Sequence, residues 1–212
     1  MPLFAGLELE RIHVLKSAAQ FNAARAEIEA HGYIGFDTET KPTFQADAVR
    51  DGPHVVQIAL PDRAFIVQIN DATPIDFLKH IVESESIVKV GFGLKSDRSP
   101  LRRKLGLRLD TTVELTQVLR SLRFKQPLGV KAAVSVVFGQ RLHKPKKVTL
   151  SDWSLPRLSP KQLIYAANDA YAALRIFEEL GSPATAILRL KPNQSFEPTR
   201  LGEPLLAAQL QR

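Results

Sequence analysis

Four carboxylates and one phenol have the types and spacing that metal-assisted hydrolysis needs. Asp37 and Glu39 stand two residues apart at the end of an apolar run, so an extended chain projects both from one face. Asp97 follows a second apolar run, and Asp169 lies in an alanine-rich segment one helical turn after Tyr165. Because an unpaired charge in apolar surroundings is costly, acids placed in this way indicate a bound cation.

Oxygen ligands of this kind suit Mg²⁺ or Mn²⁺. Two such ions about 3.5 to 4 Å apart can activate a water, orient a phosphodiester and stabilise the leaving alkoxide. Tyr165 would take a proton from the attacking water, although a free phenol has a pKa of about 10. The pattern also fits a core aromatic residue with a satisfied hydroxyl at Tyr165, and each acid alone fits a solvated charge or a helix cap.

Composition excludes several other chemistries. The 212 residues contain no cysteine, so disulfides, thiolate metal sites and cysteine nucleophiles are excluded. No apolar run approaches the roughly 18 to 20 residues that span a bilayer, and residues 1–11 lack the features of a secretory signal. We therefore expect a cytoplasmic protein without a membrane partner.

The elements that must position the acids can be predicted from hydrophobic periodicity. Short apolar runs bounded by turn residues predict strands at 11–15, 33–37, 54–60, 64–69 and 87–92. The turn at 61–63 joins two of these strands into a hairpin, so three antiparallel strands are expected near the start. Helical spacing predicts helices at 17–30, 75–82, 95–105, 112–120, 128–138 and 159–180. Strands followed by alternating strands and helices indicate an α/β fold.

The chain length fits one domain, which we place at residues 1–181 with its core at about 30–180. Ser159, Pro160 and Gln162 are typical of a helix start, and Gly181 of its end. Residues 182–212 contain several prolines and are expected to form a tail rather than a second domain.

Positive charge is concentrated in the middle of the chain. Residues 89–147 contain 15 basic and 3 acidic residues, within a total net charge of +7. Such a concentration favours a polyanionic partner, because basic surfaces gain affinity for phosphates by releasing counterions. Lys95, Arg98, Arg102 and Arg103 fall on the predicted helix that also bears Asp97, where they could follow a phosphate backbone. Residues 144–147 (KPKK) are expected to form a flexible loop that contacts phosphates.

Three segments carry a family resemblance: residues 36–40 (FDTET), 89–97 (KVGFGLKSD) and 163–171 (LIYAANDAY), supported by 55–59 (VVQIA) and 150–153 (LSDW). They resemble the exonuclease domain shared by ribonuclease D and the Werner-syndrome exonuclease, within the ribonuclease H-like superfamily. The resemblance implies an α/β fold with a ribonuclease H-like mixed sheet of about five strands flanked by helices. It also implies removal of nucleotides from a 3′ end.

The resemblance implies a role for each matching residue. Asp37, Glu39, Asp97 and Asp169 would bind two Mg²⁺ or Mn²⁺ ions, and Tyr165 would orient or deprotonate the water. Thr38 and Thr40 would contact the terminal nucleotide, and Lys95, Arg98 and Arg102 would bind the substrate strand. The expected partner is nucleic acid, at the 3′ ends of single strands or at frayed or recessed duplex ends, with DNA and RNA both open.

Two other functions remain open at this stage. One is a catalytically inactive nucleic-acid-binding module of the same fold, which is disfavoured because every catalytic position is filled. The other is a metal-dependent phosphatase of small nucleotides, which would hydrolyse mononucleotide esters faster than oligonucleotides. The residues do not indicate an oligomeric state.

Overall fold

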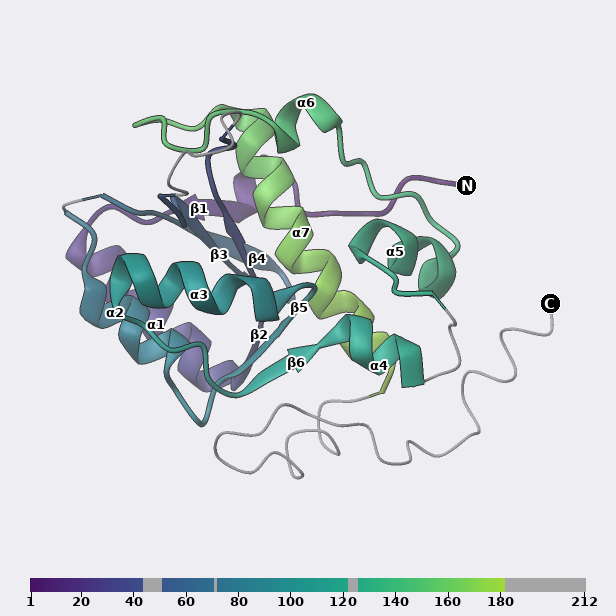
Figure 1. The fold of residues 1–212 in the computed structure, drawn as a ribbon, viewed down its shortest axis with the longest axis horizontal. Helices are drawn as coiled ribbons and strands as arrows, with labels where there is room; N and C mark the ends of the chain where they lie inside the picture. Colours follow the sequence, from purple (N-terminus) through teal and green to yellow (C-terminus); the bar gives the residue numbers. More distant parts are fainter. Residues whose placement is uncertain (44–50, 71, 122–125, 182–212) are drawn as a thin grey trace.

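The computed structural model describes residues 1–43, 51–70, 72–121 and 126–181 (Figure 1). The expected tail at 182–212 lies outside the described residues. The first half of the chain contains η1 (Leu9–Arg11), β1 (Ile12–Val14), α1 (Ala18–His31), β2 (Tyr33–Glu39), β3 (Val55–Leu60), β4 (Arg63–Gln68), α2 (Ile75–Val82) and β5 (Val88–Gly91). The second half contains α3 (Leu94–Leu105), β6 (Thr112–Glu114), α4 (Leu115–Ser121), α5 (Val130–Phe138), α6 (Lys146–Thr149) and α7 (Pro160–Glu179).

The strands form one mixed sheet in the order β1-β4-β3-β2-β5-β6. β2, β3 and β4 are antiparallel neighbours, which confirms the predicted hairpin and the three antiparallel strands. β1 pairs parallel with β4, and β5 pairs parallel with both β2 and β6. The α/β fold class is confirmed, with six strands where about five were expected.

Helices cover both faces of the sheet. One hydrophobic cluster packs α1 and α2 against side chains such as Ile34 and Phe36 of β2. On the opposite face, α7 packs against β2 and β3 and runs obliquely across the sheet, with α5 beside it and α6 near its first turns (Figure 1). Because side chains alternate along a strand, Gly35, Asp37 and Glu39 lie on the α7 face.

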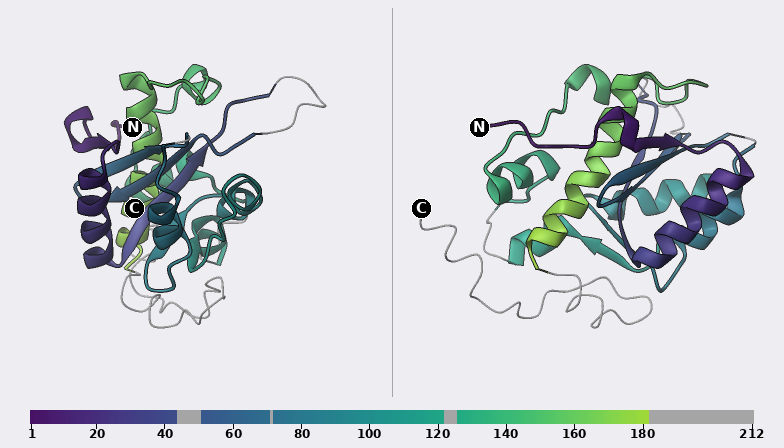
Figure 2. Two further views of the ribbon diagram at one scale, coloured as in Figure 1. Left: turned by 90° about the vertical axis from the view of Figure 1, so that its left-hand side faces the viewer. Right: turned by 180° about the vertical axis from the view of Figure 1, so that it is seen from behind.

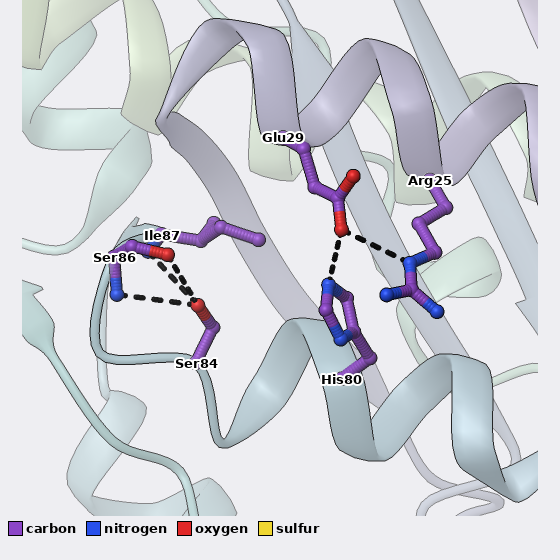
Figure 3. A network of polar contacts seen from close by, with 6 residues as sticks. All are labelled: Arg25, Glu29, His80, Ser84, Ser86 and Ile87. Carbon is purple, nitrogen blue, oxygen red and sulfur yellow. Dashed lines mark hydrogen bonds and ion pairs between the residues drawn. The ribbon is translucent and has the colours of Figure 1, made fainter.

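Polar contacts join α1 and α2, the two helices on the sheet face away from α7. Glu29 of α1 accepts a hydrogen bond of 3.0 Å from Arg25 Nε and also contacts His80 of α2 (Figure 3). At the end of α2 the Ser84 hydroxyl accepts hydrogen bonds from the backbone N–H groups of Ser86 and Ile87. The Glu29–His80 contact joins α1 to α2, and the hydrophobic cluster holds both helices on the sheet face that does not carry Asp37 and Glu39.

The helix termini follow the predicted start signals. The Ser17 and Ser159 hydroxyls each accept a hydrogen bond from the backbone N–H three residues later. The side chains of Gln20 and Gln162 in turn accept from the backbone N–H groups of Ser17 and Ser159, which completes two capping boxes. Within the described residues, no helix is both long enough and apolar enough to cross a lipid bilayer.

One predicted element was wrong. Residues 112–120 were expected to form a single helix, but Thr112–Glu114 is strand β6 and the helix begins at Leu115. Thr112 and Val113 are β-branched, and pairing with Lys89 and Val90 of β5 satisfies their backbone. The basic stretch 144–147 is also only partly a loop, because helix α6 begins at Lys146.

Candidate active site

Strand β2 and helix α7 bring three carboxylates together. One oxygen each of Asp37, Glu39 and Asp169 lies within 4.8 Å of the others. Asp37 and Glu39 project from the end of β2, and Asp169 lies in the middle of α7, 4% exposed. Gly35 permits this approach, because a Cβ atom there would stand 2.1 Å from the Ala170 carbonyl oxygen of α7.

Asp97 joins this cluster through a threonine. It lies in the first turn of α3, and the Thr38 hydroxyl donates a hydrogen bond of 2.6 Å to its Oδ1. Thr38 belongs to β2, between the two acids of that strand. Asp97 is close enough to Asp37 and Glu39 for its charge to raise the pKa of both. All four predicted acids are therefore neighbours, with Asp97 beside the tighter group of three.

The electrostatics of the cluster favour a cation. Burial, followed by the charges of Asp169, Asp97 and Glu39, raises the pKa of Asp37 well above its ordinary value. Burial and the Asp169 charge raise the pKa of Glu39 to about 8, and burial raises that of Asp97 to about 6 against the opposing hydrogen bond from Thr38. Carboxylates that resist ionisation together are stabilised by a shared divalent ion. The donor set is entirely oxygen, so the residues present fit Mg²⁺ or Mn²⁺.

Lys144 supplies a positive charge at this site and was missed as a site residue. It forms an ion pair with Asp169, and its Nζ lies 5.0 Å from the centre of the Tyr165 ring. Burial lowers the pKa of Lys144, but the Asp169 carboxylate outweighs burial and the pKa is raised. The sequence signal was the basic stretch 144–147, which gives no indication that its first residue reaches α7.

Tyr165 lies one turn before Asp169, as predicted. Its ring is 4% exposed, and its hydroxyl is 2.9 Å from Thr149 Oγ1 of α6. Burial and the Asp169 charge raise the pKa of Tyr165 to about 12. The residue is thus a buried aromatic with a bonded hydroxyl and also a neighbour of the acid cluster, and it is protonated in the absence of a cation.

The remaining predicted contacts lie around the cluster. Thr40 packs against Gly52, since a Cβ atom on Gly52 would stand 2.2 Å from its Oγ1. On α3, helical spacing places Lys95, Arg98 and Arg102 on one exposed side and Asp97 on another. Arg98 donates a hydrogen bond of 3.1 Å to Thr112 Oγ1 of β6. The three basic residues therefore form a strip along α3, on the β6 side and away from Asp97.

Glu114 is a fifth carboxylate near the site. It ends β6 and accepts hydrogen bonds from the backbone N–H groups of Gly93 and Thr116, at 3.0 and 3.2 Å. Its charge contributes to the raised pKa of Asp97. Sequence reasoning missed its position because it assigned residues 112–120 to a helix, whereas the parallel pair β5–β6 carries Glu114 to the sheet edge beside α3.

A cleft opens beside the acids. Its volume is about 320 Å³, and its lining includes Asp37 and Asp169 together with Phe92, Val130 and Lys144. A more open cleft of about 530 Å³ shares Gly129, Val130 and Lys144 with it and continues along α5. These volumes lie in the size range of small-ligand sites. The cluster is therefore accessible to a substrate of nucleotide size.

Comparison with known proteins agrees with this arrangement. A family model described as 3′-5′ exonuclease matches residues 12–183. The chain belongs to the 3′-5′ exonuclease family. The fold and enzyme class that the motifs implied are thereby confirmed, and members of this family depend on metal ions.

Relatives of this chain include a bifunctional exonuclease/helicase and a plant 3′-5′ exonuclease. The chain is 32% identical over 152 residues to the mouse bifunctional 3′-5′ exonuclease/ATP-dependent helicase WRN, covering 70% of this chain and 11% of that protein. A 3′-5′ exonuclease of Arabidopsis thaliana is 26% identical over 150 residues, 70% of this chain and 52% of that protein. The chain thus spans only part of these relatives. The structure of Trypanosoma brucei RNase D in complex with RNA U12 shares the fold, with a TM-score of 0.70 and 17% sequence identity. The match covers 92% of this chain and 77% of that chain.

Proposed function

We propose that this chain hydrolyses phosphodiester bonds one nucleotide at a time from the 3′ end of a nucleic-acid strand, with two divalent cations held by Asp37, Glu39, Asp97 and Asp169. The observation that carries the proposal is the convergence of three carboxylates from β2 and α7 within 4.8 Å, at a cleft. Mg²⁺ or Mn²⁺, when bound, would polarise the scissile phosphate and lower the pKa of the attacking water.

The chain's own residues prepare the site for this reaction. Asp37 and Glu39 come from one rigid strand, which fixes their separation, and Thr38 orients Asp97 through its hydroxyl. The hydrogen bond with Thr149 fixes the Tyr165 hydroxyl in its place near Asp169, where the hydroxyl would orient the attacking water. Tyr165 would accept a proton from that water only where nearby positive charge lowers the pKa of the phenol. These side chains come from β2, α3, α6 and α7.

Lys144 has two roles in the proposal. Without cations it neutralises Asp169, which would otherwise be a buried charge with acidic neighbours. With cations held at Asp169 in its place, the Lys144 ammonium would be free to contact the scissile phosphate of a strand bound in the cleft that Lys144 lines. Lysine suits this change of partner because its long side chain carries a mobile point charge.

The basic strip of α3 and two threonines supply substrate contacts. Lys95, Arg98 and Arg102 would contact phosphates of the strand beyond the terminal nucleotide, and Thr38 and Thr40 the terminal nucleotide itself. Nucleic acid is the proposed substrate, because the middle of the chain is strongly basic and the related Trypanosoma RNase D is described in complex with RNA. The cytoplasmic location and the single-domain organisation stay predictions.

The test uses single-stranded DNA and RNA oligonucleotides of one sequence, labelled at either the 5′ or the 3′ end, with Mg²⁺ or Mn²⁺. The proposal predicts a ladder that shortens stepwise with the 5′ label and release of labelled mononucleotide with the 3′ label. Folded protein that binds both oligonucleotides without shortening either would favour an inactive binding module. Faster hydrolysis of a mononucleotide ester than of either oligonucleotide would favour a small-nucleotide phosphatase.

A further inference from the structure

A segment that precedes the family match contacts α7 at the residue before Asp169. Residues 2–7, here called the N-terminal strap, come before β1, whereas the matched region begins at residue 12. The strap runs across α7 toward α5 (Figure 2). Its contacts are with α5, with the loop that follows α5, and with α7.

The first part of the strap pairs with the segment that leads to Lys144. Arg141 donates its backbone N–H to the Pro2 carbonyl at 2.8 Å, and the Phe4 N–H donates to the Arg141 carbonyl at 3.1 Å. These two bonds form a parallel bridge at Leu3 and Arg141. Residues 140–145, which connect α5 to α6, contain no helix, and the bridge to the strap at Arg141 is their one strand-like pairing; the Pro145 carbonyl accepts instead from Val148 and Thr149 of α6.

The last part of the strap is fixed to the residue before Asp169. The Leu7 N–H donates to Asn168 Oδ1 at 2.6 Å, and Asn168 Nδ2 donates to the Leu7 carbonyl at 3.1 Å and to the Ile164 carbonyl at 2.9 Å. A Cβ atom on Gly6 would stand 2.3 Å from Asn168 Oδ1, so the strap needs glycine there. Between the two anchors, the Phe4 ring packs against Phe138 and Tyr171.

We propose that the strap positions Lys144, by holding its loop in register with α7 so that the ammonium stays in the cleft that Lys144 lines together with Asp37 and Asp169. The two ends of the strap are bonded to the two backbone segments whose side chains form the Lys144–Asp169 ion pair. One end is bonded to residues 140–145 through Arg141, and the other to α7 through Asn168. This inference rests on the proposed function for its catalytic consequence. A displacement of about 1 Å at a reacting group can cost up to a hundredfold in rate, so a loosened loop has a measurable effect.

The test compares Gly6→Ala, which displaces the strap from Asn168, with Ala5→Ser at the neighbouring exposed position as control. Gly6→Ala is expected to lower kcat on the order of tenfold with a smaller change in KM, because it disturbs positioning. In a Lys144→Met background the same substitution is expected to cause no further loss, since the group it positions is gone. Phe4→Ala, which loosens the strap without a clash, should repeat the pattern if Gly6→Ala unfolds the protein.

Hydrogen exchange gives a readout that does not need activity. Gly6→Ala is expected to speed amide exchange in residues 140–145 while exchange in β2 and β3 is unchanged. Equal losses of kcat in both Lys144 backgrounds, or unchanged exchange in 140–145, would overturn the positioning role. An inactive wild-type chain would instead overturn the proposed function, and the exchange result would still decide whether the strap holds the loop.

Discussion

The carbonyl oxygen of Ala170 lies 2.1 Å from the position that a Cβ atom on Gly35 would occupy, so α7 contacts β2 at a distance that excludes every side chain. Asp169 is the residue before Ala170, and Asp37 is the next residue on the same face of β2. The absence of a side chain at Gly35 thus sets the separation of the two acids.

Gly35→Ala is therefore expected to separate α7 from β2. Because backbone atoms cannot give way cheaply, the free energy of unfolding should fall by about 1 to 3 kcal/mol or more, and hydrolysis should fall with it. Gly129→Ala is the matched control for stability, since no atom lies within 4 Å of its added Cβ. Urea denaturation of both variants measures the difference; equal stabilities would contradict the close approach.

Tyr165→Phe is expected to lower kcat by about a hundredfold or more, in the range of a lost proton-transfer group, while the ring keeps its packing. The lost hydrogen bond to Thr149 should cost only about 1 kcal/mol of stability. Tyr171→Phe is the control, because the Tyr171 hydroxyl accepts a hydrogen bond from Arg175 on the same helix. Similar kcat values for the two variants would remove Tyr165 from the chemistry.

Lys144→Met is expected to destabilise the metal-free protein, because the buried Asp169 carboxylate loses the ammonium that stabilises its charge. It should also bind Mn²⁺ more tightly than wild type, since no ammonium has to be displaced. Isothermal titration calorimetry and thermal unfolding with and without Mn²⁺ check both effects. Weaker Mn²⁺ binding by the variant would contradict competition between Lys144 and the cation.

Lys89 makes stability depend on pH at a point remote from catalysis. It is fully buried in β5, where its Nζ donates to the carbonyls of Ser84 and Ile87 at 2.7 and 2.8 Å, and burial lowers its pKa from 10.5 to about 7. Between these values the unfolded chain binds more protons than the folded one. The contribution of Lys89 to the free energy of unfolding should therefore rise with pH, by at most about 1.4 kcal/mol per unit.

The check is urea denaturation of wild type and Lys89→Met at pH 7 and pH 9. The stability of wild type relative to the variant should increase between the two pH values, because the penalty for burying the charged ammonium is present in full below pH 7 and is lost progressively between pH 7 and 10.5. A difference that does not change with pH would show that Lys89 titrates normally.

Local patterns were sufficient to predict part of this site. The two-residue spacing of Asp37 and Glu39 and the four-residue spacing of Tyr165 and Asp169 each place two side chains on one face, whatever the tertiary structure. The boundary between β6 and α4 could not be predicted in this way, because three residues are too few for a period and the pairing partner, β5, lies more than 20 residues earlier. Lys144 was missed for a related reason: its contact with Asp169 depends on how an irregular loop packs.

The most direct test of the account is hydrolysis of a 5′-labelled oligonucleotide by wild type, Asp37→Asn and Asp62→Asn, with Mn²⁺ and with chelator. Asp62 is an exposed acid on a turn and serves as the control. The account predicts stepwise shortening by wild type and Asp62→Asn only with the metal, and a rate at least about a thousandfold lower for folded Asp37→Asn, because cation-based charge stabilisation is worth several kcal/mol. Shortening by Asp37→Asn at the wild-type rate, or by wild type in chelator, would contradict it.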